Sequence, residues 1–347
     1  MRIGYSTLRN DLGAPADRRR FVYYAQRRNL PFEIARPGQP YDLIVTSSSG
    51  DLSEWSRVPR STKLVLDMVD SYLDEPPLSP RALVRGAAKF ALGHTRRLHL
   101  NYRSLIEATC RRADAVVCAT EEQRDRIAAY NSNVHVILDF QSQEVAKIKT
   151  DYRRGEVFRL VWEGLGVSLS TFETFAGTWR ELRRRHKIEL HLVTHLAIPT
   201  GSSSIGLRPA HDIVQRMLGD GVFLHQWNVS MLATIATECD LAVIPIPLEQ
   251  PFYAGKPANK LLFFWRLGLP AVTSATPAYL RAMKAAGLDM TCRVESEWLP
   301  MIEKLMNDEG LRQHAGELGR RLVERDYSEQ SLLERWDAVL ASIQEGR

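Results

Sequence analysis

Short apolar runs typical of strands recur along the chain and alternate with amphipathic stretches that have helical spacing. In the first 140 residues the expected strands cover 1–7, 31–35, 41–47, 63–69, 113–120 and 133–139, and the expected helices cover 17–28, 79–112 and 121–130. The run KLVLDMV at 63–69 is nearly continuously apolar, as in strands that are covered on both faces. This strand–helix–strand order predicts a parallel sheet with helices on both faces.

The same pattern restarts after a polar segment at 141–156, which we interpret as an interdomain linker. The strands expected in the second half cover 158–164, 188–195, 221–227, 240–246 and 269–274, and 294–344 is mostly helical. The chain is therefore predicted to be an α/β protein with two doubly wound domains, at 1–140 and 157–327. Open sheets of this kind bind ligands beyond the carboxyl ends of their strands.

The composition is that of an ordinary folded protein and leaves several classes of partner open. The 347 residues are 44% apolar and 25% charged, which is enough for two ordinary cores. The net charge of +5 fits an anionic ligand, an anionic membrane surface or nucleic acid, and selects none of them. Basic residues are scattered and no nucleic-acid motif is present, so nucleic acid is not an expected partner.

Cysteine usage and the absence of targeting segments bear on location. The four cysteines form no CxxC pair and are expected to be buried free thiols of a reducing compartment. The first ten residues are too short and polar for a signal peptide, and no run approaches the roughly 20 apolar residues of a membrane span. We expect a cytoplasmic protein, either free or at the inner face of the cytoplasmic membrane.

The stretch KPANKLLFFWRLGLPAV at 256–272 carries the clearest chemical signal. Lys256, Asn259 and Lys260 stand at the start of an apolar helix that leads into a buried strand. A helix start has unpaired N–H groups and the positive end of the macrodipole, so this pattern favours an anion site. The alternative is two solvated lysines at an ordinary helix start.

Three stretches resemble the GT-B glycosyltransferases, in particular bacterial members of the group 1, family 4-like kind. They are RADAVVCATEEQRDRIAAYNSNVHVILDF at 112–140, the segment 222–274 with its Lys-x-x-Asn-Lys helix start before Gly-Leu-Pro, and GELGRRLVERDYSEQSLLERWDAVLAS at 316–342. The resemblance covers most of the chain and is most specific at 240–274.

The resemblance implies two Rossmann-like domains facing a cleft, with the closing segment 328–347 crossing back to the N-terminal domain. It implies transfer of a sugar from a nucleotide-diphospho-sugar, most commonly a UDP- or GDP-sugar, held mainly by the C-terminal domain. The acceptor hydroxyl would belong to a glycan or lipid-linked molecule in surface polysaccharide or glycolipid assembly. No metal or other cofactor is expected. Asn259, Lys260 and their helix start would hold the donor phosphates.

The sequence departs from the family at two acidic positions. Counting back from Gly268-Leu269-Pro270 puts Phe263 where family members carry a ribose-binding glutamate, and Gly255 at the other common acid. Either Glu249 takes over part of this role, or the donor is held differently, or catalysis has been lost. A non-catalytic GT-B protein that binds a sugar, nucleotide or protein partner is therefore the alternative function. We expect Phe263 to pack in the core.

Further donor-side candidates lie at expected strand ends. Gly164 and Gly166, in WEGLGVSLS, would let backbone N–H groups approach phosphate, although such turns also occur without ligands. Trp227 and His195 end two strands, where they would line the base pocket or simply pack. Glu249 follows a buried strand in a Pro-rich loop and would contact sugar or ribose.

Acceptor-side candidates lie in the N-terminal half. Asp67 and Asp70 follow the strand at 63–69, where one carboxylate would deprotonate an acceptor if the enzyme inverts, or would serve as a turn residue. Gly13 and Arg18, in LGAPADRRRF, would meet an acceptor or phosphate. The basic amphipathic region 81–112 is typical either of a membrane-surface helix or of a solvated helix face.

Overall fold

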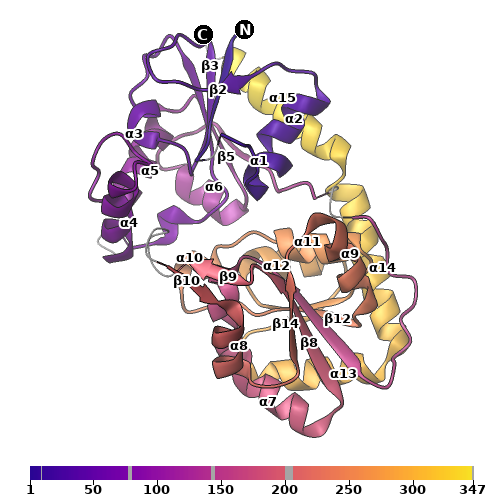
Figure 1. The fold of residues 1–347 in the computed structure, drawn as a ribbon. Coiled ribbons are helices and arrows are strands. Elements are labelled where there is room, and N and C mark those ends of the chain that lie inside the picture. Colours follow the sequence, from indigo (N-terminus) through magenta and orange to yellow (C-terminus); the bar gives the residue numbers. More distant parts are fainter. Residues whose placement is uncertain (9, 77–79, 142–144, 200–205, 346–347) are drawn as a thin grey trace. The chain divides into compact units, whose positions relative to one another are not determined.

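The computed structural model describes residues 1–8, 10–76, 80–141, 145–199 and 206–345, and Figure 1 traces their order. The chain forms two compact units. Unit 1 comprises Met1–Phe140, Gly255–Pro257 and Tyr327–Arg347, and unit 2 comprises Gln141–Ala254 and Ala258–Asp326. The segment expected as a linker, 141–156, thus belongs to unit 2. Gly255–Pro257 belong to unit 1 although the chain on both sides of them belongs to unit 2.

Unit 1 is built on a six-stranded sheet in which every described strand pair is parallel. Its order is β2-β1-β3-β4-β5-β6, with β1 Ile3–Ser6, β2 Glu33–Ile34, β3 Leu43–Ser47, β4 Lys63–Asp67, β5 Ala115–Cys118 and β6 Val134–Val136. After β1 the chain forms β2 on one side of that strand, and it then adds β3 to β6 on the other side. The switch point of this sheet therefore lies between β1 and β3. The carboxyl edge near this switch point is where open α/β sheets bind ligands.

The helices of unit 1 differ from expectation in two places. They are α1 Pro15–Arg19, α2 Phe21–Arg27, α3 Leu52–Trp55, η1 Tyr72–Asp74, α4 Pro80–Ala91, α5 Tyr102–Arg112, α6 Glu121–Ile127 and α15 Glu329–Glu345. The helix expected at 17–28 breaks at Arg20, whose backbone leaves helical geometry (φ −130°, ψ −118°). The region expected as one helical stretch at 79–112 is α4 and α5 joined by a loop.

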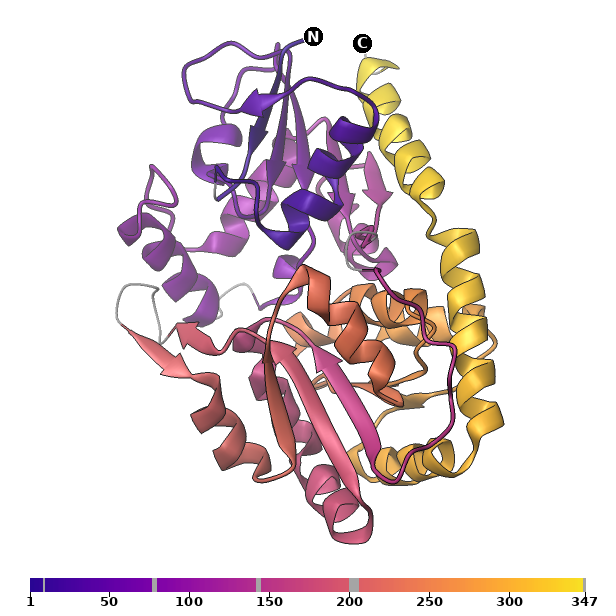
Figure 2. The same ribbon diagram turned by 45° about the vertical axis from the view of Figure 1, so that its right-hand side comes forward.

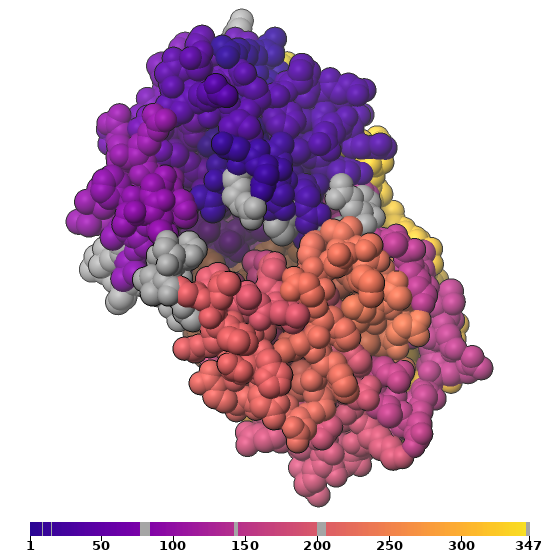
Figure 3. All heavy atoms as spheres, viewed as in Figure 1, coloured from indigo at the N-terminus to yellow at the C-terminus, as the bar shows by residue number. Residues whose placement is uncertain are grey.

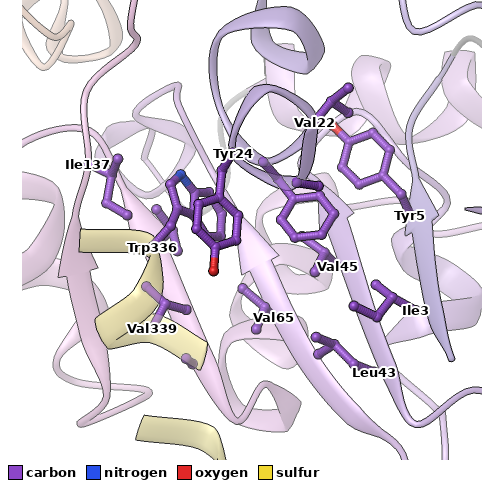
Figure 4. Packing of buried hydrophobic residues seen from close by; sticks show 14 of the residues in the cluster. Ile3, Tyr5, Val22, Tyr24, Leu43, Val45, Val65, Ile137, Trp336 and Val339 are labelled. Atoms are coloured by element: carbon purple, nitrogen blue, oxygen red, sulfur yellow. The ribbon is translucent and has the colours of Figure 1, made fainter. Parts of the chain in front are cut away.

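The last described helix completes the core of unit 1. Trp336 of α15 is fully buried, and its ring centroid lies 5.5 Å from that of Phe21 and 5.8 Å from that of Tyr24. Figure 4 shows Trp336 next to Tyr24. Val339 and Ile343 join the same cluster, which also includes β1 and β3. Residues more than 300 positions apart therefore share one hydrophobic core.

Unit 2 contains a second six-stranded parallel sheet, visible in Figure 2. Its order is β11-β8-β7-β12-β13-β14, with β7 Phe158–Glu163, β8 Ile188–Thr194, β11 Val222–Gln226, β12 Leu241–Ile244, β13 Ala271–Ser274 and β14 Thr291–Cys292. Numbered along the chain within this sheet alone, the order is 3-2-1-4-5-6, the doubly wound order, whose switch point lies between β7 and β12. β9 Ala197–Pro199 and β10 Leu207–Pro209 form a separate antiparallel pair.

Helices cover both faces of this sheet. They are η2 Gly166–Phe175, α7 Ala176–Arg185, α8 Ala210–Leu218, α9 Val229–Glu238, α10 Pro251–Ala254, α11 Asn259–Arg266, α12 Pro277–Ala285, η3 Glu295–Glu297, α13 Trp298–Asn307 and α14 Glu309–Asp326. All four cysteines are buried free thiols, which confirms the sequence prediction. No helix in the described part of the chain has the length and apolar character needed to cross a membrane.

Candidate functional site

A lysine lies over a tryptophan ring at the switch point of the unit 2 sheet. The Lys260 ammonium, in the first turn of α11, is 4.1 Å from the ring centroid of the buried Trp162 in β7. A Cβ on Gly164, directly after β7, would lie 2.4 Å from Lys260 Nζ and 2.6 Å from the Trp162 ring. Only glycine leaves room here for the ammonium to lie against the end of the strand.

We expect Gly164→Ala to displace Lys260 and to lower the stability of unit 2 by about 1–3 kcal/mol, the usual cost of overpacking. Thermal unfolding measures this directly, because about 1 kcal/mol shifts the midpoint by roughly 2–4 °C in a unit of this size. Gly155→Ala is the matched control, since an added Cβ there would have only the Val157 carbonyl oxygen nearby, at 3.8 Å. Equal melting temperatures for the two variants would contradict the crowding argument.

The start of α11 presents backbone donors beside this lysine. Asn259 and Lys260 are the first two residues of the helix, and the N-cap residue, Ala258, makes no side-chain capping hydrogen bond. The N–H groups of a first turn carry the positive end of the helix dipole. The ammonium and the helix start therefore form one cationic corner at the carboxyl edge of the sheet.

Other predicted donor-side residues lie at neighbouring strand ends. Trp227, directly after β11, donates its indole N–H to Glu163 Oε1 at 3.0 Å, and its backbone N–H to the Thr194 carbonyl at 2.9 Å. His195 is exposed directly after β8. Gly166 begins η2, where an added Cβ would lie 3.4 Å from the His195 carbonyl oxygen. The structure thus brings Gly164, Gly166, His195 and Trp227 to the ends of three adjacent strands.

Sequence reasoning missed Glu163 and Trp162 as part of this corner. Glu163 fixes the Trp227 indole and Trp162 supports the Lys260 ammonium. Their position directly before the first glycine of the turn was the available signal.

Glu249 lies on an exposed turn before α10. Phe263 is 1% exposed and packs against Phe264, which confirms that it belongs to the core.

In unit 1, the predicted Asp67 is engaged by a buried arginine. Arg20 is fully buried and donates to Asp67 through Nη2 at 2.6 Å and Nε at 2.9 Å, and to the Ile137 carbonyl at 2.6 Å. Burial lowers the pKa of Arg20, but the charges of Asp67 and Asp139 outweigh it and raise the pKa above its ordinary value. Arg20, the residue at which the expected first helix breaks, thus binds the carboxylate at the carboxyl end of β4.

The second predicted aspartate, Asp70, lies with Lys256. Burial raises the pKa of the Asp70 carboxyl, while the nearby charges of Lys256 and Arg85 act in the opposite direction. Burial likewise lowers the pKa of Lys256, against the attraction of Asp70. Sequence analysis placed Lys256 with Asn259 and Lys260, but the structure groups it with Asp70 in unit 1.

A short hydrogen-bond chain holds the Lys256 segment on unit 1. Ser71 Oγ donates to the Gly255 carbonyl at 2.6 Å, and Gln123 Nε2 donates to Ser71 Oγ at 2.9 Å. An added Cβ on Gly255 would lie 2.4 Å from both Ser71 Oγ and Asp74 Oδ2. This close approach leaves no room for a side chain at position 255.

The remaining predicted residues are Gly13, in the loop before α1, and Arg18, in the last turn of α1. Arg18 Nε donates to the Gly13 carbonyl at 3.3 Å, and the Gly13 N–H donates to Asp11 Oδ1 at 2.9 Å. Within the described residues no three His, Cys, Asp or Glu side chains are grouped so that they could hold a metal ion.

Comparison with known proteins places the fold. No family model matches the sequence, and no curated protein matches it either. Among solved structures, the Anabaena protein HepE in complex with UDP superposes with a TM-score of 0.62 at 13% identity, over 99% of this chain and 100% of that one. Sucrose-phosphate synthase from Thermosynechococcus elongatus gives 0.62 at 14% identity, over 88% and 75%.

The structure of TarM superposes with a TM-score of 0.60 at 11% identity, over 86% of this chain and 54% of that one. The chain therefore spans about half the length of TarM. The protein has the GT-B fold. The fold and the GT-B resemblance expected from the sequence are thus confirmed, with two Rossmann-like parallel sheets. In GT-B terms, the cationic corner lies on the C-terminal Rossmann-like unit and Asp70 on the N-terminal one.

Proposed function

We propose that the protein transfers a sugar from a UDP-sugar to a hydroxyl of a glycan or lipid-linked acceptor, in the assembly of a surface polysaccharide or glycolipid. The Lys260 ammonium in the first turn of α11, in the space left by Gly164, is the observation that carries this proposal. The UDP present in the HepE complex and in a TarM complex supports uridine as the nucleoside.

The cationic corner suits a diphosphate leaving group. Negative charge builds up on the diphosphate as the glycosidic bond breaks, so donors already aimed at it lower the barrier. Lys260 and the first N–H groups of α11 would hold the phosphates, and Asn259 would add a side-chain donor. Trp227, its plane fixed by Glu163, would stack on the base at the end of β11.

The acceptor hydroxyl needs a base if the reaction inverts configuration. Asp70 fits this role better than Asp67, because Asp67 is 4% exposed and ion-paired to Arg20. A carboxylate with a raised pKa accepts a proton more readily near neutral pH. In this proposal Lys256 stabilises the ionised form of Asp70 before transfer.

One observation favours a second candidate, a non-catalytic protein that binds a nucleotide, a sugar or a protein partner. Phe263 is buried core where the family carries its ribose-binding glutamate, and Gly255 is tightly enclosed where the other acid lies. Both family carboxylates are therefore missing. The test must measure nucleotide binding and sugar transfer separately.

We expect Lys260→Ala to weaken UDP binding about ten- to hundredfold while the fold remains intact, since a charge-assisted contact to phosphate contributes about 1.5–3 kcal/mol. Isothermal titration with UDP measures the affinity. Lys284→Ala, an exposed lysine on α12 of the same unit, is the control and should bind like wild type. Unchanged UDP affinity in Lys260→Ala would contradict the proposed donor phosphate site at Lys260. Tight UDP binding without transfer or hydrolysis across a panel of UDP-sugars would favour the non-catalytic protein.

A further inference from the structure

The carboxylate of Glu163 lies at the carboxyl edge of the unit 2 sheet, close to the cationic corner. Glu163 is the last residue of β7, a central strand of that sheet, and its side chain is partly exposed. Successive side chains of a strand point to opposite faces, so Glu163 projects away from Trp162 and from the Lys260 ammonium that lies on the Trp162 ring. A carboxylate repels a diphosphate, so a ligand of this edge meets Glu163 favourably only through an uncharged part.

Trp227 brings its indole across the end of β8 to this carboxylate. It follows β11, the edge strand, and its backbone N–H donates to the Thr194 carbonyl at the end of β8, at 2.9 Å. Figure 3 shows the helix that leads into β11, α8, at the surface of unit 2, in red. The indole N–H donates to Glu163 Oε1 at 3.0 Å. Because an indole N–H lies in the plane of its ring, Glu163 lies at the edge of the Trp227 ring and not over its face.

Trp227 uses only part of the hydrogen-bonding capacity of Glu163. An ionised carboxylate accepts through both of its oxygens. Among the described residues, the Trp227 indole is the single hydrogen-bond donor to Glu163. Glu163 Oε2 is not one of the buried polar atoms that lack a partner, so solvent reaches it. Oε2 is therefore an accessible acceptor, and the bond to Oε1 fixes its position.

An acceptor in this position distinguishes two kinds of nucleobase. A base stacked on the Trp227 ring would have one edge beside Glu163 Oε2. Uracil, thymine and guanine carry a ring N–H on their Watson–Crick edge, whereas cytosine and adenine carry an unprotonated ring nitrogen there. A carboxylate pairs with the N–H and repels the lone pair. Uracil and cytosine have nearly the same size, so comparing them isolates this contact.

We propose that Glu163 selects uracil by accepting the N3–H of the base through Oε2, while Trp227 holds Oε1 and stacks on the ring. This inference rests on the proposed function, because it uses the UDP-sugar donor and the stacking role of Trp227. The nucleoside then gains a carboxylate contact although Phe263 and Gly255 replace the acids of the GT-B family. The contact is to the base and not to the ribose, and it comes from β7 and not from α11.

Isothermal titration with UDP and with CDP tests the proposal. Wild type should bind UDP about ten- to hundredfold more tightly than CDP, the usual effect of one hydrogen bond to a charged group. In Glu163→Gln the Trp227 indole can donate only to the amide oxygen, so the amide N–H groups turn to the base. The variant should bind UDP more weakly and CDP more tightly, which lowers the ratio of affinities at least about tenfold. Glu238→Gln, at an exposed glutamate ending α9, is the control and should keep the wild-type ratio.

The phosphate site provides a second readout. Lys260→Ala should weaken UDP and CDP by the same factor, because the two nucleotides share their diphosphate. Thermal unfolding should give wild-type midpoints for Glu163→Gln, which keeps the shape of the side chain and the acceptor for Trp227. Equal affinities of wild type for UDP and CDP, or an unchanged ratio in Glu163→Gln, would overturn the base contact alone. Wild type that binds neither nucleotide would overturn it together with the proposed function. A preference for UDP that Glu163→Gln removes, without sugar transfer, would uphold the base contact and reject only the transfer.

Discussion

Asp70→Asn is expected to lower kcat for sugar transfer by about two to four orders of magnitude, the usual contribution of a positioned general base. Asparagine keeps the shape of aspartate but cannot accept the proton of the acceptor hydroxyl. The affinity for UDP should not change, because the proposed phosphate-binding residues Asn259 and Lys260 are in unit 2. Steady-state transfer kinetics and UDP titration on the same preparation separate the two effects. Asp125→Asn, an exposed aspartate of α6, is the matched control.

The pH dependence gives a second readout of the same role. Burial raises the pKa of Asp70, so the acid limb of kcat/KM should lie above the ordinary aspartate value of about 3.9. Lys256 opposes that shift, so Lys256→Met should move the limb to still higher pH. Wild-type kcat in Asp70→Asn, or an acid limb that does not respond to Lys256→Met, would contradict the general-base role. Asp70 would then be a turn residue.

Trp336→Ala is expected to destabilise unit 1 by about 3–5 kcal/mol, the cost of removing a large buried aromatic side chain. The indole is 0% exposed and packs against Phe21 and Tyr24. Amide hydrogen exchange should accelerate in β1, β3 and β4, while β7, β8 and β12 keep their protection.

Two substitutions serve as controls for this result. Trp298→Ala removes a tryptophan that is 3% exposed in unit 2, so it should accelerate exchange in the other sheet. Trp336→Phe should cost less than alanine, because it keeps a ring and removes an indole N–H that has no hydrogen-bond partner among the described residues. Unchanged protection of β1 and β3 in Trp336→Ala would show that α15 adds little to the unit 1 core.

The sequence predicted the parts of the fold that depend on local pattern. The apolar runs at 63–69 and 240–246 contain β4 and β12, and the burial of Phe263 followed from its place in an apolar helix. Such runs reveal their structure because burial on both faces removes polar alternation. Gly164 and Lys260 were each expected near phosphate from separate signals, a glycine turn and a helix start, and the structure brings them together.

What the sequence could not reveal depends on contacts between distant residues. The helical pattern breaks at Arg20, whose guanidinium binds Asp67, 47 positions away. In α4, Arg85 binds Glu75 and Lys89 binds Tyr102, and no periodicity within the helix can indicate these two partners. The grouping of Lys256 with Asp70 likewise arises only when the chain returns to unit 1.

The closing helix also sets an order of folding during synthesis. Residues 1–140 leave the ribosome without Trp336, Val339 and Ile343, which fill their core. All of unit 2 is made in the interval, on the order of 10–40 s at 5–20 residues per second. Unit 2 can finish first, whereas the N-terminal sheet waits with Phe21 and Tyr24 uncovered. Folding should therefore run opposite to the usual N-terminal-first direction, and the waiting sheet is the part of the nascent chain that most needs a chaperone.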